Sequence, residues 1–264
     1  MIRMPVSGNL YFSQHCIKVT ENPPLVLIHG AGGTHLYWPP EIRRLPGYCV
    51  YGIDLPGHGK SELCDGQQTI GEYAWYLVQW LESIQLRRAV LIGHSMGSAI
   101  ALDLAIHHPE YVVGLGLISG GARLRVHPDL LNYAADKTTY SKAAEFLVSN
   151  FFSTNASPRL VQLASKRLLE TRQSVFLGDL QACDRFDVMN RLGMIQQPTL
   201  VVCGTGDQMT PLRYAQFLSN TIPNAQLSII PDAGHMVMLE QPRLVAESLL
   251  SFLKGIPFHP GEEF

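Results

Sequence analysis

The sequence predicts an α/β fold in which a doubly wound, mostly parallel β-sheet carries an inserted all-helical cap. Short runs rich in Val, Leu and Ile alternate with longer segments whose apolar residues recur at helical intervals. Strands that are apolar throughout are typical of parallel sheets covered by helices on both faces. The alternation stops over residues 120–197, where helical patterns occur without a strand-like run. An insertion between parallel strands lies at one end of the sheet, so we expect this one to cover an edge.

The composition is that of a globular protein, and its balanced charge favours a small-molecule partner. The 264 residues carry a formal net charge of −2 and no run of like charges, so we expect no nucleic-acid partner and no membrane partner. The N-terminal residues lack the sustained apolar stretch of a signal peptide, and no segment approaches the roughly 18 apolar residues of a membrane span. We therefore expect a cytoplasmic protein, and the sequence leaves its oligomeric state open.

The cysteines are odd in number and scattered, and no two have CxxC spacing. This pattern favours free thiols in a reducing compartment. We expect Cys64 to be the most exposed, because it lies in a polar loop. The other four cysteines are Cys16, Cys49, Cys183 and Cys203.

The first predicted element is a β-hairpin. Apolar and polar residues alternate in its two strands, at residues 10–12 and 16–19, on either side of a polar bend. Apolar runs then predict buried strands at residues 23–28 and 48–55, with a helical pattern at 37–45 between them.

The strand at residues 23–28 runs into a glycine-rich loop, His29-Gly30-Ala31-Gly32-Gly33. Glycines let the backbone approach a neighbour closely and expose N–H groups. Neither GxGxxG nor GxxxxGK(S/T) is present, which disfavours a nucleotide site. We interpret the segment as a loop that offers N–H groups to an oxyanion, with His29 as a brace.

The strand at residues 48–55 leads into a turn, Pro56-Gly57-His58-Gly59-Lys60-Ser61. Asp54 and His58 are candidates for catalysis. Short polar side chains in such turns more often bond the nearby backbone, so we expect a structural role for both.

Ser95 occupies a corner between a strand and a helix. A helical pattern at residues 70–86 precedes an apolar strand that ends in Gly93-His94-Ser95-Met96-Gly97, and an Ala/Leu/Ile-rich helix follows. Such a corner forces an unusual backbone conformation and requires small flanking residues. The Gly-x-Ser-x-Gly elbow lifts a serine hydroxyl above the sheet at a helix N-terminus. Because side chains alternate along a strand, we expect His94 to point away from Ser95.

The later elements complete the chain. A strand at residues 111–119 precedes the insertion, and strands at 198–203 and 226–230 follow it. The helical patterns are at 130–137, 143–152, 158–170 and 175–183 in the insertion, and at 212–220 and 241–253 after it. We divide the chain into core residues 1–119, a helical cap at 120–197 and core residues 198–264.

Four loops, which hold Ala31, Ser95, Asp207 and His235, follow separate strands. The C-terminal loops of parallel strands meet at one edge of the sheet. A serine needs a base to become nucleophilic, an imidazole is a suitable base near neutral pH, and a carboxylate orients the imidazole. The carboxylates that remain open as alternatives to Asp207 are Asp184, Asp187 and Asp232.

These motifs resemble the α/β-hydrolase family over nearly the whole chain outside the cap. The glycine loop is similar to the family's HG-x oxyanion loop, residues 54–61 to its D-x-P-G-x-G-x-S turn, and residues 93–97 to its elbow. Its acid and histidine loops correspond to residues 204–211 and 232–235. One departure is Ser98, where relatives often carry a third glycine.

The resemblance implies a serine carboxylesterase that forms an acyl-enzyme. Ser95 would be the nucleophile, His235 the base and Asp207 its orienting acid, with the N–H groups of Met96 and Ala31 as the oxyanion hole. It implies no cofactor and no metal. We expect small to medium, fairly apolar ester substrates.

Other reactions of the family remain open. Dehalogenases and epoxide hydrolases use an aspartate nucleophile, and Ser95 argues against them. Hydrolysis of carbon–carbon bonds, enol-lactone opening and perhydrolase chemistry use the same triad. Arg123 and Arg125 would favour the first two if they bound a substrate carboxylate, but we expect solvated charges. A ligand receptor without catalysis is the alternative from a different class.

Overall fold

The computed structural model describes residues 6–7, 10–16, 21–61 and 65–258. Within them, one eight-stranded sheet has the order β1-β2-β4-β3-β5-β6-β7-β8. β1 and β2 pair antiparallel, and all pairs from β4 to β8 are parallel. The strands are β1 (Val6–Ser7), β2 (Leu10–His15), β3 (Leu25–Ile28), β4 (Val50–Ile53), β5 (Ala89–His94), β6 (Val112–Ile118), β7 (Thr199–Gly204) and β8 (Ala225–Ile230). The predicted α/β class with a mostly parallel sheet is confirmed.

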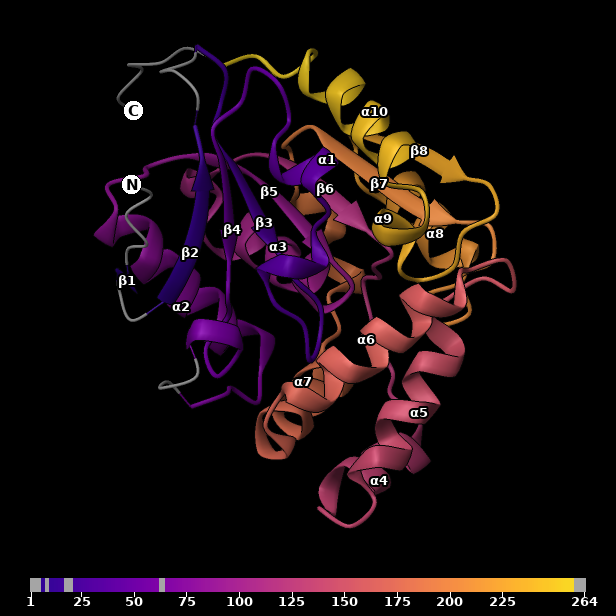
Figure 1. The fold of residues 1–264 in the computed structure, drawn as a ribbon. Coiled ribbons are helices and arrows are strands. Elements are labelled where there is room, and N and C mark those ends of the chain that lie inside the picture. Colours follow the sequence, from indigo (N-terminus) through magenta and orange to yellow (C-terminus); the bar gives the residue numbers. More distant parts are fainter. Residues whose placement is uncertain (1–5, 8–9, 17–20, 62–64, 259–264) are drawn as a thin grey trace.

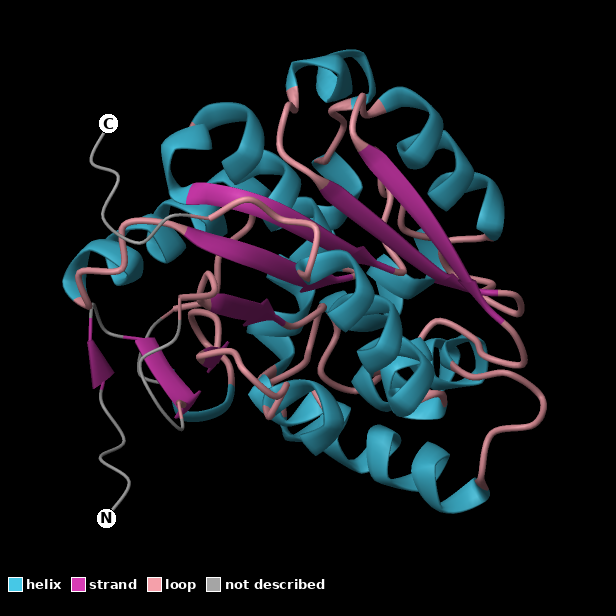
Figure 2. Ribbon diagram, turned by 90° about the horizontal axis from the view of Figure 1, so that it is seen from above, coloured by secondary structure: helices cyan, strands magenta, loops and turns pink. Residues whose placement is uncertain are grey.

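Helices cover both faces of this sheet (Figure 2). One buried cluster joins the sheet to α2 (Ile70–Ser83), α3 (Met96–His107) and α8 (Leu212–Thr221). The other joins it to α1 (Pro40–Arg43) and α10 (Pro242–Leu253). Shorter elements are η1 (His35–Tyr37), η2 (Gly59–Ser61), η3 (Pro109–Tyr111), η4 (Met189–Met194) and α9 (Val237–Glu240). None of the described helices is long and apolar enough to cross a membrane.

The helices between β6 and β7 form a unit that we call the helical insertion. They are α4 (Pro128–Ala135), α5 (Tyr140–Phe151), α6 (Pro158–Glu170) and α7 (Gln173–Arg185). Figure 1 shows them together at one end of the sheet. At the base of the insertion, Arg123 and Asp187 form an antiparallel bridge, and the Val188 N–H donates to the Ala122 carbonyl at 2.8 Å. The segments that enter and leave the insertion are therefore joined to each other by backbone pairing.

The expected hairpin at residues 10–12 and 16–19 is wrong in its position. Residues 13–15 continue β2 where a bend was expected, because this end of β2 pairs with β4, from Phe12 opposite Ile53 to His15 opposite Val50. The hairpin partner of β2 is β1. Residues 17–19 of the expected second strand lie outside the described residues.

The expectation of free thiols is wrong for one pair of cysteines. Cys16 and Cys49 form a disulfide with their Cα atoms 4.4 Å apart. They follow the β2–β4 register, in which His15 lies opposite Val50, so strand pairing brings together two residues that sequence spacing does not relate. Cys183 and Cys203 are free and buried, and Cys64 lies outside the described residues. Disulfides persist mainly in oxidising compartments, so this pair gives no support to a cytoplasmic location.

Candidate active site

Ser95 lies at the corner where β5 ends and α3 begins. Its backbone has φ 52° and ψ −115°, a conformation that is sparsely populated for residues other than glycine. A Cβ on Gly93 would collide with the Gly97 carbonyl, and one on Gly97 with the Ile28 carbonyl. The departure at Ser98 has a structural reason, since its hydroxyl donates to the Gly93 carbonyl at 2.7 Å. The corner therefore needs both flanking glycines and is tied to β5 by Ser98.

Asp207 and His235 meet in the loops that follow β7 and β8. Nδ1 of His235 lies 3.1 Å from both carboxylate oxygens of Asp207. The carboxylate also accepts hydrogen bonds from the N–H groups of Met209 and Thr210 at 2.9 Å, and from the Thr210 hydroxyl at 2.8 Å. An ionised carboxylate only accepts, so Nδ1 is the ring nitrogen that carries the proton and Nε2 is left to face the cavity.

The pKa of Asp207 is lowered from its ordinary value of 3.8. Burial opposes ionisation, but the charge of His235 and the hydrogen bonds from His235 and Thr210 outweigh it. Because the folded pKa lies below the unfolded one, the ionised carboxylate stabilises the fold above pH 3.8, and this contribution is lost as the pH falls through the folded pKa. We expect the stability difference between the wild type and Asp207→Asn to be smaller at pH 3 than at pH 6. Urea unfolding of both proteins at the two pH values measures it, and an unchanged difference would contradict the lowered pKa.

His94 does not point away from the site, contrary to the expectation from strand alternation. It lines the same cavity as Ser95, and its Nε2 lies 3.0 Å from the backbone carbonyl of His235. Burial, and next the charge of His235, lower the pKa of His94 to about 3, so its ring is neutral and Nε2–H donates to that carbonyl. Alternation fails here because β5 ends at His94 and the backbone turns sharply at Ser95. His94 therefore contacts and helps hold the His235 loop.

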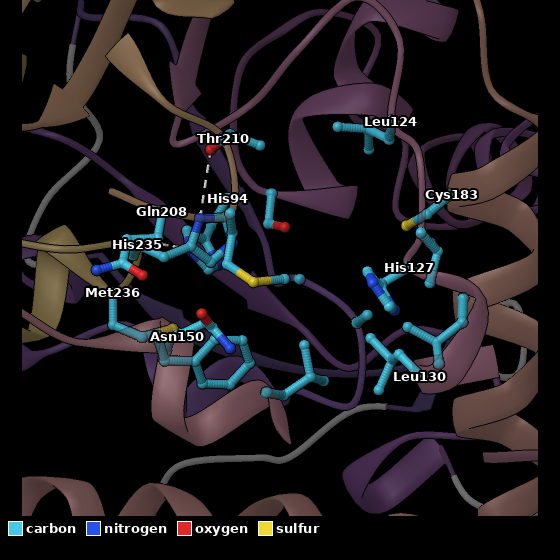
Figure 3. A pocket seen from close by; sticks show the side chains of 18 of the residues that line it. His94, Leu124, His127, Leu130, Asn150, Cys183, Gln208, Thr210, His235 and Met236 are labelled. Carbon is cyan, nitrogen blue, oxygen red and sulfur yellow. Dashed lines mark hydrogen bonds between the residues drawn. The ribbon is translucent and has the colours of Figure 1, made fainter. Parts of the chain in front are cut away.

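Ser95 and His235 line one cavity of about 280 Å³. Figure 3 shows His94, His235 and Thr210 on one side of it and His127, Leu130 and Cys183 on the other. Ser95 is half-buried. No hydrogen bond joins its hydroxyl to the His235 ring in the described part of the chain, as is common in ligand-free sites whose catalytic bonds shorten on binding.

The glycine-rich loop passes beside the elbow. A Cβ on Gly30 would lie 3.1 Å from the Cβ of Ser95 and 2.9 Å from Nδ1 of His94. Ala31 lines the cavity, and Met96 is the first residue of α3. In the described residues, neither the Ala31 N–H nor the Met96 N–H donates to a protein acceptor. The Ala31 N–H is therefore available to an acceptor in the cavity, and the Met96 N–H follows Ser95 directly in the chain.

The sequence model described as alpha/beta hydrolase fold matches residues 23–242. The chain belongs to the α/β-hydrolase family. Among its relatives, a Pseudomonas syringae pv. syringae protein named carbamate hydrolase RutD is 26% identical over 94% of this chain and 100% of its own length.

Solved structures of α/β hydrolases superpose closely. A thermophilic esterase from Thermogutta terrifontis has a TM-score of 0.84 and 25% identity, covering 94% of this chain and 93% of that one. The enol-lactonase from Burkholderia xenovorans LB400 has a TM-score of 0.86 and 22% identity, covering 93% and 96%. This second likeness shows the fold alone. The family and the fold of this α/β hydrolase are thus established, and it is a hydrolase.

The polar side chains of the glycine loop and the following turn are buried in this α/β hydrolase. His29 accepts from the Leu55 N–H at 3.0 Å and donates to the Gly30 carbonyl at 2.8 Å. Its pKa is lowered to about 4, first by burial and next by the charge of His58. Asp54 contacts Nδ1 of His35 at 2.8 Å. These contacts fit the structural roles expected for His29 and Asp54.

Sequence reasoning missed the contacts that the helical insertion makes with the catalytic loops. The Met236 N–H donates to the Phe151 carbonyl at 3.0 Å, and the Phe151 ring stacks on His235 with centroids 5.9 Å apart. Glu240 accepts from the N–H groups of Ser153 and Gly234 at 2.9 and 2.8 Å. Asp179 and Thr171 contact the glycine loop. No sequence signal indicates these partners, because they are far apart in the chain.

In the described residues, the other candidate carboxylates and the two arginines make their contacts with partners other than the His235 ring. Asp187 is 3.7 Å from Arg123 and 3.8 Å from Arg125. Asp184 accepts from the Val126 N–H at 3.1 Å, at the base of the insertion. Asp232 is exposed. Of the four carboxylates considered, Asp207 is the one that contacts His235. In the described residues, no group of three or more His, Cys, Asp or Glu side chains could hold a metal ion.

Proposed function

We propose that this α/β hydrolase is a serine carboxylesterase that cleaves small to medium esters through an acyl-enzyme. The observation that carries the proposal is the meeting of three features at one cavity: the strained Ser95 corner, the His235 ring oriented by Asp207, and Ala31, whose N–H has no protein acceptor in the described residues. Labelling with a fluorophosphonate tests it. Mass spectrometry should find the adduct on Ser95, and an unlabelled or differently labelled protein would contradict the proposal.

The chemistry follows from these positions. Nε2 of His235 takes the proton of Ser95 as the Ser95 oxygen bonds to the ester carbon, and the carbonyl electrons move to its oxygen. The N–H groups of Ala31 and Met96 donate to this oxyanion. Collapse breaks the bond to the alcohol, which receives the proton from His235. Water then attacks the acyl-enzyme with His235 again as base, and release of the acid restores Ser95.

The size of the cavity supports the proposal that the substrates are small to medium. Its volume of about 280 Å³ lies just below the usual range for ligand sites, roughly 300–1,000 Å³. Leu130, Phe146 and Leu180 of the helical insertion supply apolar lining. We propose that residues 120–197 act as a cap on a core of residues 1–119 and 198–264. The cap then limits the acyl chain.

We expect kcat/KM on p-nitrophenyl esters to peak at short acyl chains and to fall at least tenfold from butyrate to dodecanoate, because a long chain exceeds the cavity. Steady-state rates across an acetate-to-dodecanoate series measure this. The matched variant Phe146→Ala should move the peak toward longer chains. Rates that rise steadily to dodecanoate in the wild type would contradict the size limit.

Enol-lactone opening or carbon–carbon bond hydrolysis is the second candidate. The observation that favours it is Arg125, which lines the cavity and could pair with a substrate carboxylate. Arg125 already faces Asp187, which makes a neutral ester the better substrate. A panel with an enol-lactone, a dienoate, a carbamate and p-nitrophenyl butyrate decides between them. The substrate with the highest kcat/KM by tenfold or more identifies the reaction.

A further inference from the structure

A carboxylate of the helical insertion reaches the glycine-rich loop. Asp179 of α7 is fully buried, and its Oδ2 accepts a hydrogen bond from the Gly32 N–H at 2.8 Å. The same oxygen lies 2.8 Å from Nε2 of His58, and the Tyr73 hydroxyl donates to Oδ1. Asp179 thus joins α7 to the glycine loop, to the turn after β4 and to α2.

His58 lies between a backbone carbonyl and the Asp179 carboxyl group. Its Nδ1 lies 3.0 Å from the Pro56 carbonyl, and its Nε2 faces the Asp179 carboxylate. Burial lowers the pKa of His58, but the contacts with Asp179 and with the Pro56 carbonyl outweigh it and raise the pKa. A buried pair of this kind is costly to break by removing one partner.

The other backbone group of Gly32 is also held by the insertion. The Thr171 hydroxyl donates to the Gly32 carbonyl at 3.0 Å. A Cβ on Gly32 would collide with Leu168 of α6 and lie 3.0 Å from Phe176 of α7, so the loop is packed directly beneath both helices. Residues of the insertion thus fix both hydrogen-bonding groups of one residue in the glycine loop.

Gly32 is the residue at which this loop turns. The Gly33 N–H donates to the Gly30 carbonyl at 3.1 Å, and Gly32 has φ +63°. These are features of a type II turn with Ala31 and Gly32 at its centre. Rotation of the Ala31–Gly32 peptide would direct the Ala31 carbonyl oxygen toward the Asp179 carboxylate, where two acceptors repel. The carboxylate therefore selects one orientation of this peptide. In doing so it holds the turn closed by the Gly30 carbonyl, which also contains the neighbouring Gly30–Ala31 peptide that carries the Ala31 N–H.

We propose that Asp179 and Thr171 are positioning residues that hold the glycine loop in the conformation in which the Ala31 N–H can stabilise the transition state. The helical insertion then contributes to the oxyanion hole in addition to lining the cavity. This inference rests on the proposed function, because the orientation of the loop matters for rate only if Ala31 donates to the oxyanion.

Thr171→Val and Asp179→Asn test the proposal, with Thr171→Ser as the conservative variant. Thr139→Val is the matched control, because the Thr139 hydroxyl bonds the Tyr133 carbonyl within the insertion. Rates are measured on p-nitrophenyl butyrate. Binding is measured for phenylboronic acid, whose serine adduct carries a tetrahedral oxyanion mimic, and for benzamide, a planar carbonyl compound.

Thr171→Val and Asp179→Asn are expected to lower kcat and phenylboronic acid affinity in parallel, by about 10- to 100-fold. This is less than the roughly 10²- to 10³-fold loss seen when an oxyanion donor is removed, because these variants loosen the loop and leave the donor in place. KM and benzamide affinity should change less than threefold. Thr171→Ser should restore both quantities to within threefold of the wild type, and Thr139→Val should leave them unchanged.

Two results would overturn the proposal. One is wild-type rate and boronate affinity in a folded Thr171→Val, which decides the matter even where Asp179→Asn does not fold. The other is an equal loss of benzamide and boronate affinity, which indicates general damage to the cavity. Failure of the proposed function is distinguishable, because wild-type protein would then not bind phenylboronic acid through Ser95.

Discussion

Ser95→Ala should lower kcat on p-nitrophenyl butyrate by about 10⁴- to 10⁶-fold, the range for loss of a serine nucleophile. The reason is that in the proposed mechanism the acyl-enzyme forms through the Ser95 oxygen, whereas the nearby Ser98 hydroxyl donates to the Gly93 carbonyl. The substitution removes one oxygen from a half-buried side chain. The positive φ of residue 95 stays as strained for alanine as for serine, so stability should change little.

Steady-state rates and a thermal melt of the same preparation check this result. Ser219→Ala is the matched control, because Ser219 is half-buried on α8, as Ser95 is at its corner, and in the described part of the chain its hydroxyl donates to the nearby Gln216 carbonyl. The control should keep wild-type kcat. Ester hydrolysis by folded Ser95→Ala at more than a tenth of the wild-type rate would show that the reaction takes another route.

Asp207→Asn should lower kcat by about 10⁴-fold. An asparagine amide can donate to Nδ1 of His235, which favours the tautomer with the proton on Nε2 and leaves no base facing Ser95. The change also removes the negative charge that stabilises the imidazolium. KM should change little, because Asp207 is buried and is not among the side chains that line the cavity.

Asp232→Asn is the matched control for this prediction. Asp232 lies in the same loop as His235 but is exposed, and its φ of +52° is a conformation that asparagine tolerates. We expect wild-type kcat for Asp232→Asn. If this variant lost activity while Asp207→Asn kept it, the carboxylate that orients His235 would have been assigned wrongly.

Local pattern was a sound guide to the central strands of the sheet because they are buried along their whole length. Every residue of β5 and β6 is buried. A continuous apolar run of this kind predicts a strand from local sequence, with no information on distant contacts. The same reasoning failed at β2, an antiparallel strand near the sheet edge with polar residues at its end. Pairing with β4 holds Ser13 and Gln14 extended, and no local signal reports that pairing.

The predicted orientation of His94, pointing away from Ser95, was wrong for a related reason. Alternation applies within a strand, and His94 is the last residue of β5, next to a residue with positive φ. The disulfide between Cys16 and Cys49 likewise depends on cross-strand register. Such features depend on which segments become neighbours.

The sequence by itself determined the fold class, the strand-to-helix corner at Ser95 and the candidate residues that end the strands. These follow from apolar periodicity and from the small side chains that a sharp turn requires, both of which act over a few residues. Only the tertiary structure decided that Asp207 contacts His235, that His94 holds the His235 loop, and that Asp179 reaches Gly32 across 147 positions of sequence. Contacts of this kind form when segments far apart in the chain pack together, so residue spacing along the sequence does not predict them.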